Sequence, residues 1–166
     1  AADLRVLGMK ISIGQDTVYE KYWDEDCRRN IYSASKSFTS CAVGFAVQEG
    51  LIDLDERLMD AFKEDIPNNP DENLKKATVK DLLTMTLGQE KGFLMGKQRP
   101  RMEEQNWVKA SLAIPFVYEP GTHFVYNNVG PYLAGILVQR RAGCDLLSYL
   151  TPRLLKPLGI RKTIWE

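Results

Sequence analysis

Apolar residues follow two different periods along this chain. Between Leu4 and Ile13 they alternate loosely with polar residues, residues 14–16 (Gly-Gln-Asp) are typical of a turn, and residues 17–23 are again rich in β-branched and aromatic side chains. This pattern predicts a β-hairpin. A hairpin alone is a poor sheet, because its apolar face needs further strands or a covering layer. We therefore expect it either to pack on helices or to pair with strands that these residues do not supply.

The strongest helical pattern covers residues 33–49. Apolar residues recur there at helical spacing, at Phe38, Cys41, Ala42, Phe45 and Ala46, with Val43 and Val47 widening the apolar face. Gly50 follows as a natural C-terminal stop. The pattern predicts a buried helix in which Cys41 packs as a small hydrophobic residue.

Capping residues and stops predict further helices. They cover residues 56–62, 78–88, 106–114, 130–142 and 145–155, the last kinked or interrupted at Pro152. Loops are expected at 67–70 (Pro-Asn-Asn-Pro) and from residue 89 to Pro100. The chain is thus predicted to be one hairpin followed mostly by helices, an α+β arrangement.

Composition narrows the classes of partner. At 166 residues and 44% hydrophobic, the chain can bury one sizeable core. Lys plus Arg equal Asp plus Glu at 22 each, so no strong field exists to attract nucleic acid or an anionic membrane. The basic stretch of Lys97, Arg99 and Arg101 is balanced by Glu103 and Glu104, and we interpret it as a solvated loop. A small molecule or peptide recognised locally fits this composition better.

The cysteines and the N-terminus give little information about cofactors or cellular compartment. Cys27, Cys41 and Cys144 are odd in number and widely spaced, and the chain has one histidine, so neither structural zinc nor a disulfide framework is expected, and nothing calls for a cofactor. Three thiols slightly favour a reducing, cytoplasmic compartment. No apolar run is long enough to span a bilayer. Because residues 1–3 (Ala-Ala-Asp) lack an initiator Met and a signal-peptide pattern, we expect a processed or trimmed start and leave export open.

The first candidate for chemistry is Ser33-x-x-Lys36, a spacing found once in the chain. On a helix, residues i and i+3 are neighbours on one face, so the lysine amine can reach the serine hydroxyl. In the first turn, unpaired backbone N–H groups and the helix dipole also favour developing negative charge. The spacing indicates a nucleophile and its base, although alone it is a weak signal.

The second candidate is Tyr126-x-Asn128, also found once. A phenol can relay a proton and a carboxamide can position a substrate amide, which are both functions that an acyl-transfer serine requires nearby. The alternative is that Tyr126 anchors a loop and Asn128 caps the next helix, as Pro131 suggests. His123, the lone histidine, is interpreted as a turn residue rather than a triad base, since Lys36 already fills the base position.

These motifs belong to a longer pattern that resembles the serine β-lactamase-related family, in its branch of class C β-lactamases, penicillin-binding D-peptidases and esterases. The resemblance runs from about residue 8 to the last residue. It rests on stretches in the family's order: 33–38 (Ser-Ala-Ser-Lys-Ser-Phe), 48–55 (Gln-Glu-Gly-Leu-Ile-Asp-Leu-Asp), 81–88 (Asp-Leu-Leu-Thr-Met-Thr-Leu-Gly), 120–128 with Pro-Gly-Thr and Tyr-x-Asn, and 155–160 (Leu-Lys-Pro-Leu-Gly-Ile). Met85 and Leu87 depart from it, because the family commonly has His and Ser there.

The resemblance implies a β-lactamase/transpeptidase-like α+β fold, present as one partial domain, 1–166, in which 1–30 form the hairpin part of the sheet and 31–166 the helical region. It also implies roles. Ser33 would be the acylated nucleophile, Lys36 the amine that helps deprotonate it, Tyr126 the proton relay to the leaving group, and Asn128 the ligand to the substrate carbonyl or amide. Whether Lys36 or a Tyr126 phenolate is the general base stays open.

The family's third motif, Lys or His followed by a small residue and Gly on a sheet-edge strand, is not found in these residues. Residues 162–164 (Lys-Thr-Ile) imitate its start but lack the glycine and directly follow the last helix. In the family that strand supplies one of two N–H donors of the oxyanion hole, and losing one donor costs on the order of a hundredfold in rate. We therefore expect the C-terminal strands of the sheet to be missing here and these 166 residues alone to be weak or inactive.

The leading hypothesis is a serine acyl hydrolase that forms an acyl-enzyme on Ser33 and acts on an amide or ester, such as a β-lactam, a D-peptide or a simple ester. The alternative is a non-hydrolytic protein of the same fold that binds or senses β-lactams or peptidoglycan. A structural helical domain with accidental motifs is the third possibility. Oligomeric state is not predicted.

Overall fold

The computed structural model describes residues 6–25, 27–94, 96–101 and 103–165, and its contacts divide the chain into two compact units, Ala1–Tyr32 and Ser33–Glu166. The division lies close to the predicted boundary between hairpin and helical region, whereas the assignment of both to one domain stays a prediction. Leu4, where the predicted first strand begins, lies outside the described residues.

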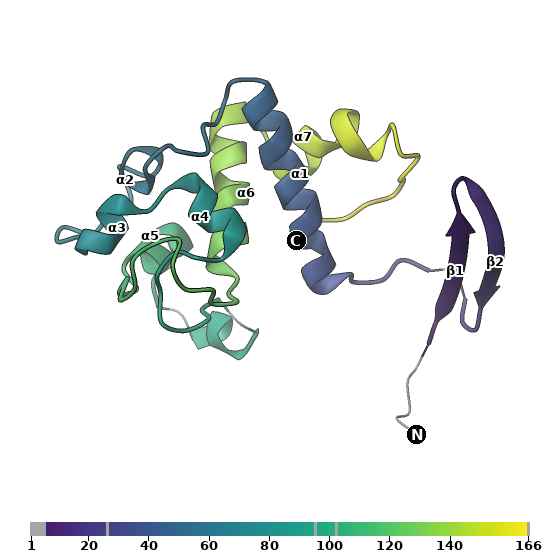
Figure 1. The fold of residues 1–166 in the computed structure, drawn as a ribbon, viewed down its shortest axis with the longest axis horizontal. Helices are drawn as coiled ribbons and strands as arrows, with labels where there is room; N and C mark the ends of the chain where they lie inside the picture. Colours follow the sequence, from purple (N-terminus) through teal and green to yellow (C-terminus); the bar gives the residue numbers. More distant parts are fainter. Residues whose placement is uncertain (1–5, 26, 95, 102, 166) are drawn as a thin grey trace. The chain divides into compact units, whose positions relative to one another are not determined.

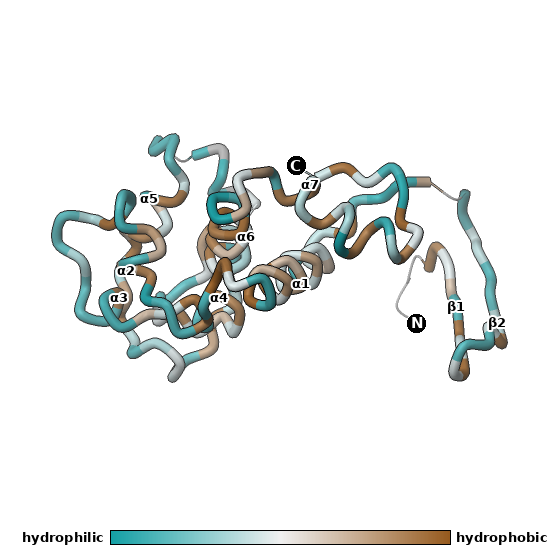
Figure 2. The backbone as a smooth tube through the Cα atoms, turned by 90° about the horizontal axis from the view of Figure 1, so that it is seen from above, coloured by the Kyte–Doolittle hydropathy of each residue, from teal (hydrophilic) through white to brown (hydrophobic). Residues whose placement is uncertain are grey.

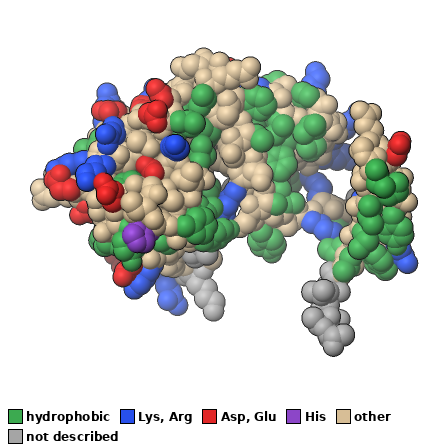
Figure 3. Space-filling model, in the orientation of Figure 1, with side chains coloured by type: hydrophobic (Ala, Val, Ile, Leu, Met, Phe, Trp, Pro, Cys, Tyr) green, Lys and Arg blue, Asp and Glu red, His purple; other side chains and the backbone are tan. Residues whose placement is uncertain are grey.

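The first unit contains the predicted hairpin (Figure 1). β1 (Gly8–Ile13) pairs antiparallel with β2 (Asp16–Tyr22), in a register that places Ile11 opposite Tyr19. Gly14 forms the turn with a φ of 59°, a left-handed conformation that glycine adopts without strain. Every residue of both strands is exposed, and hydrophobic side chains gather on this hairpin in Figure 3. The predicted hairpin is confirmed, with its apolar side chains uncovered within its own unit.

The second unit is helical (Figures 1 and 2). Its elements in chain order are η1 (Tyr32–Ala34), α1 (Ser35–Gln48), α2 (Leu58–Ala61), α3 (Glu72–Lys76), α4 (Val79–Thr84), η2 (Gly96–Arg101), α5 (Trp107–Leu112), α6 (Val129–Ala142), α7 (Leu146–Leu150) and η3 (Thr151–Leu155), where η1 and η2 are 3-10 helices and η3 is a π-helical turn. In the described part of the chain, none of the helices combines the length and apolar content that a bilayer crossing requires.

The core of this unit lies around α6. Helices α1 and α6 run side by side, and α4 packs on α6 from another direction (Figure 1). α1 contributes its buried small residues Thr39, Ala42, Val43 and Ala46, so the two helix backbones approach closely. α6 is buried along most of its length, at Val129, Gly130, Leu133, Ala134, Gly135, Leu137 and Val138. The relative positions of these helices are therefore set by small side chains.

The prediction that Cys41 packs inside the helix interface is wrong, because its side chain is exposed. One residue advances a helix by about 100°, so Cys41 points away from the stripe formed by Ala42, Val43 and Ala46. Val47 is also 37% exposed. The apolar face of α1 is wider than the surface that α6 covers. The sequence pattern alone therefore could not identify which apolar residues are buried.

Helix boundaries mostly follow the predicted caps. The helix expected at 130–142 is confirmed as α6, which ends at Gly143 in the left-handed conformation, and the helix beginning after Asp145 continues into the π-helical turn at Pro152. α4 is shorter than predicted, because Met85 is left-handed (φ 57°) and ends it. α3, at residues 72–76, was not predicted.

Candidate active site

Ser33 lies in the 3-10 turn that leads into α1, and Lys36 lies in the first turn of the helix. The helix begins at Ser35, two residues later than predicted, yet the neighbourhood expected from the spacing is present. Lys36 Nζ donates a hydrogen bond to Ser33 Oγ at 3.2 Å. The local geometry therefore brings an amine into contact with an exposed hydroxyl.

The structure brings the second motif to the same place. Tyr126 OH donates to Ser33 Oγ at 2.6 Å, and Lys36 Nζ donates to Asn128 Oδ1 at 2.8 Å. The four residues predicted from the two motifs thus form one continuous hydrogen-bonded set, although the residues in contact across the motifs lie more than ninety positions apart in the sequence. Ser33 is exposed and Tyr126 is 44% exposed, so a substrate can reach both oxygens.

The surroundings of Tyr126 stabilise its ionised form. The hydrogen bond with Ser33 and the positive charge of Lys36, whose Nζ lies 5.4 Å from the ring centre, hold the pKa of the Tyr126 phenol below its ordinary value, although partial desolvation opposes them. A neutral phenol donates to Ser33 Oγ, whereas a phenolate accepts the serine's proton in the same position. Tyr126 can therefore act as either a proton donor or a base toward Ser33 without moving.

The loop before Tyr126 is fixed to the segment that follows α4. Tyr118 N donates to Gly88 O at 2.9 Å, Gly121 N donates to Thr86 O at 2.9 Å, and Val125 N donates to Met85 O at 3.0 Å. Gly88 has a φ of +95°, and a Cβ there would lie 2.2 Å from Tyr118 O, so this close approach requires glycine.

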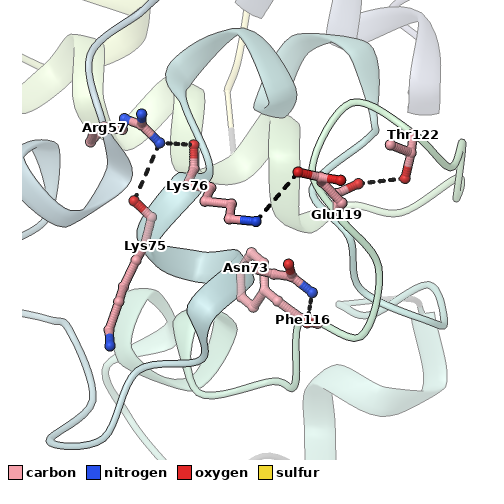
Figure 4. A network of polar contacts seen from close by, with 7 residues as sticks. All are labelled: Arg57, Asn73, Lys75, Lys76, Phe116, Glu119 and Thr122. Atoms are coloured by element: carbon pink, nitrogen blue, oxygen red, sulfur yellow. Dashed lines mark hydrogen bonds and ion pairs between the residues drawn. The ribbon is translucent and has the colours of Figure 1, made fainter.

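Figure 4 shows a second anchor of this loop on α3. Asn73 Nδ2 donates to Phe116 O at 2.8 Å, and Lys76 Nζ lies 3.3 Å from Glu119 Oε1. Within the loop, Thr122 Oγ1 donates to Glu119 O at 2.6 Å. α3, which the sequence pattern did not predict, therefore helps to hold the segment that carries Tyr126.

His123 is part of the same turn. Its ring stacks on Tyr118 with centroids 4.2 Å apart, and its Nδ1 lies 2.8 Å from Thr122 Oγ1. The hydroxyl of Ser33 is instead contacted by Lys36 and Tyr126. These contacts agree with the interpretation of His123 as a turn residue.

The alternative role for Asn128, capping the next helix with its side chain, is not what the structure shows. Asn128 is the N-cap residue of α6, but its carboxamide contacts Lys36 through Oδ1 and Leu94 O through Nδ2, at 2.9 Å. The helix is capped by the buried Asn127, whose Oδ1 accepts from Gly130 N at 3.0 Å. Asn127 therefore caps the helix and Asn128 contacts the site, which agrees with the choice of Asn128 from the Tyr-x-Asn motif and the family resemblance.

Arg99 and Arg101 of the basic stretch are exposed, as predicted for a solvated segment, but the stretch is not an irregular loop. Residues 96–101 form the 3-10 helix η2, and Arg99 Nε donates to Leu94 O at 2.9 Å, the same carbonyl that Asn128 contacts. Lys97 lies in this helix, but its side chain is outside the described part. A backbone carbonyl leaves no mark in the sequence, so neither Leu94 nor Arg99 could be associated with the site beforehand.

A family model described as Beta-lactamase matches residues 3–166. Monacolin J acid methylbutanoyltransferase of Aspergillus terreus is 31% identical over 157 residues, which cover 82% of this chain and 37% of that protein. Lovastatin esterase of Penicillium rubens is 31% identical over 150 residues, which cover 77% of this chain and 37% of the esterase.

Solved structures share the fold. The octameric penicillin-binding protein homologue from Pyrococcus abyssi matches with a TM-score of 0.74 and 24% identity, over 93% of this chain and 39% of that one. The chain therefore spans a little over a third of the length of the relatives it matches.

Proposed function

Because the chain belongs to the serine β-lactamase-related family, we propose that it carries the nucleophile of an enzyme that forms an acyl-enzyme on Ser33 from an amide or ester. The family comprises serine hydrolases and acyl-transfer enzymes, and the predicted β-lactamase/transpeptidase-like α+β fold is confirmed by the solved structures that match. The observation that carries the proposal is the convergence of Tyr126 OH, at 2.6 Å, and Lys36 Nζ, at 3.2 Å, on one exposed serine oxygen.

In the proposed acylation, Ser33 Oγ attacks the substrate carbonyl and its proton passes to Tyr126 or Lys36. The bond from the carbonyl carbon to the leaving nitrogen or oxygen then breaks, and the same proton is returned to the leaving group. Water or another acceptor hydroxyl or amine afterwards attacks the acyl carbon and gives its proton to the same base. The bond from that carbon to Ser33 Oγ then breaks, and the base returns the proton to Ser33 Oγ. Hydrolase and transferase differ only in this second acceptor.

The lowered pKa of Tyr126 supports the phenolate as the base toward Ser33. The phenol formed after proton transfer is then placed to protonate the leaving group. Lys36 would contribute through its charge and its hydrogen bonds to Ser33 and Asn128. Asn128, held beside them, is placed to contact the substrate carbonyl or amide.

For the substrate, we propose a range of candidates rather than one compound. The names of the two fungal relatives describe acyl transfer to monacolin J acid and hydrolysis of the lovastatin ester, and they support an ester beside the β-lactam and D-peptide candidates. A non-hydrolytic binding protein would also form the acyl-serine, but would release it slowly.

The test is labelling of the natural protein with a fluorescent penicillin and with a fluorophosphonate, followed by mass mapping of the adduct. We expect the adduct on Ser33, none in Ser33→Ala, and full labelling in Ser37→Ala, a matched exposed serine one turn further along α1. Labelling that persists in Ser33→Ala would disprove the assignment.

Turnover of a chromogenic ester or cephalosporin separates an enzyme from a binding protein. Loss of the nucleophile is expected to reduce kcat on the order of a thousandfold or more. Product analysis with and without an added alcohol or amine then distinguishes hydrolysis from acyl transfer. Stoichiometric labelling without turnover of any of these substrates would favour the binding protein.

A further inference from the structure

The carboxamide of Asn128 is held at both ends. Its Oδ1 accepts from Lys36 Nζ at 2.8 Å, and its Nδ2 donates to Leu94 O at 2.9 Å. If the carboxamide rotated by half a turn, its NH2 group would face the lysine amine and its oxygen would face the Leu94 oxygen. Two attractive contacts would become two repulsive ones, so the Leu94 carbonyl selects the orientation that presents an acceptor to Lys36.

Leu94 needs support to present its carbonyl in this direction. Its φ is +56°, in the left-handed region that non-glycine residues rarely adopt. Its side chain is only 2% exposed, so packing in the core fixes one side of the residue. On the other side, Arg99 Nε donates to Leu94 O at 2.9 Å, and together with Asn128 Nδ2 it supplies a donor for each lone pair of this oxygen.

We propose that Arg99 is a positioning residue of the active site: through Leu94 O it fixes the carboxamide of Asn128 and, through that carboxamide, the amine of Lys36 beside Ser33. The contacts form an unbroken series of hydrogen bonds of 2.9, 2.9, 2.8 and 3.2 Å from the guanidinium to the serine oxygen. Arg99 touches neither Ser33 nor Lys36 in this series and acts only through its intermediates. The inference rests on the proposed function, because its readout is the acylation of Ser33.

Loss of the Arg99 donor leaves one lone pair of the Leu94 oxygen free and removes the restraint on a strained peptide. The Leu94 peptide is then free to turn its oxygen away from Asn128, which removes the preference against the rotated carboxamide, and Lys36 loses a fixed acceptor. Arg99 is an exposed residue of η2 and is not part of the core of the unit. The effect is therefore expected on the rate of acylation rather than on folding.

The test measures kcat and KM for a chromogenic ester in the natural protein. Arg99→Met keeps an unbranched side chain that reaches about as far as Nε and removes the donor, and we expect kcat to fall about tenfold, as for loss of one hydrogen bond to a charged group, with KM changed less than twofold. Arg99→Lys, which keeps a cationic donor, is expected to recover part of this loss. Arg101→Met, the matched control at the end of the same helix, is expected to retain the wild-type rate.

A double-mutant cycle distinguishes positioning from general support. If Arg99 acts through Asn128, then Arg99→Met has no further effect on kcat in the Asn128→Ala background. Multiplicative losses in the double mutant, or a wild-type kcat in Arg99→Met, would overturn the inference. A failure of the proposed function gives a different result: the activity would survive in Ser33→Ala. That result does not depend on the effect of the Arg99 variants.

Discussion

Replacing Gly130 with alanine tests the closest contact between α4 and α6. An added Cβ would lie 2.3 Å from Leu82 O and 3.2 Å from Leu82 C. Both are backbone atoms, so no side-chain rotation can relieve the contact. Ordinary van der Waals contact begins near 3.4 Å, and the two helices would therefore have to separate locally by roughly 1 Å.

The expected magnitude follows from two opposing effects. Overpacking of this kind costs about 1–3 kcal/mol. Alanine regains up to about 1 kcal/mol of helix propensity, and less at Gly130 because it lies in the first turn of α6. We expect a net loss of about 1–2 kcal/mol in the free energy of unfolding, or a melting temperature lower by about 2–8 °C for a domain of this size.

The matched control is Gly135→Ala on the same helix. Gly135 is also buried, but a Cβ there would lie 3.5 Å from Leu146 Cδ2 and 3.7 Å from Thr39 Cγ2, which is ordinary contact. This variant should be as stable as the wild type or more stable by up to about 1 kcal/mol.

Urea denaturation followed by circular dichroism measures both variants. Gly130→Ala is expected to show the lower midpoint, and it should also slow acylation, because Gly130 N binds Asn127 Oδ1 beside Asn128. An unchanged midpoint in Gly130→Ala, or equal losses in both variants, would show that the close approach of Gly130 to Leu82 O does not limit the packing of α4 on α6.

Three further predictions concern charged and capping groups. The hydrogen bond with Ser33 and the charge of Lys36 lower the pKa of Tyr126, so this phenol should ionise below pH 10 in a near-ultraviolet titration corrected with Tyr126→Phe. Lys36→Met should move that ionisation to higher pH, and no movement would contradict the role of the charge. Arg153 lowers the pKa of Glu49 through hydrogen bonds at 2.7 and 3.0 Å, so the ion pair stabilises the fold above the ordinary pKa of 4.5 and is lost as pH falls below it. Glu49→Gln should therefore have a lower melting temperature than the wild type at neutral pH, and the difference should shrink in acid. A difference in melting temperature that stays the same at every pH would contradict the role of this ion pair. Asp81→Ala removes the acceptor for two hydrogen bonds at the N-terminus of α4 and should cost about 1–2 kcal/mol in urea denaturation; a loss below a few tenths would refute the capping role.

Local signals predicted the elements well where the chain supplied caps. α6 lies between Asn128 and Gly143, and its predicted range differs from the observed one by a single residue. The neighbourhood of Ser33 and Lys36 was also predictable, since it depends on helical spacing alone. α3 was missed because its five residues carry too short a pattern for periodicity to identify.

The meeting of the two motifs could not come from spacing. More than ninety residues separate Ser33 from Tyr126, and the path between them depends on how loops close on α3 and α4. The sequence joined these motifs only through the family resemblance. Leu94 shows the same limit more sharply, because a left-handed leucine has no local signal and is held by its buried side chain and by the hydrogen bonds that Arg99 and Asn128 donate to its carbonyl.

The packing of α1 on α6 gives the site its electrostatic setting. Ser33 and Lys36 lie at the N-terminus of α1, Asn128 is the N-cap of α6, and the contact of 2.8 Å between Lys36 and Asn128 brings these two N-termini together. Each helix has 14 residues, long enough for its N-terminus to carry a partial positive charge. Two such ends favour the negative charge that develops on a carbonyl oxygen attacked by Ser33. The small residues that let α1 and α6 approach therefore serve the proposed reaction, and Gly130, which sets α6 against α4, should influence the rate as well as the stability.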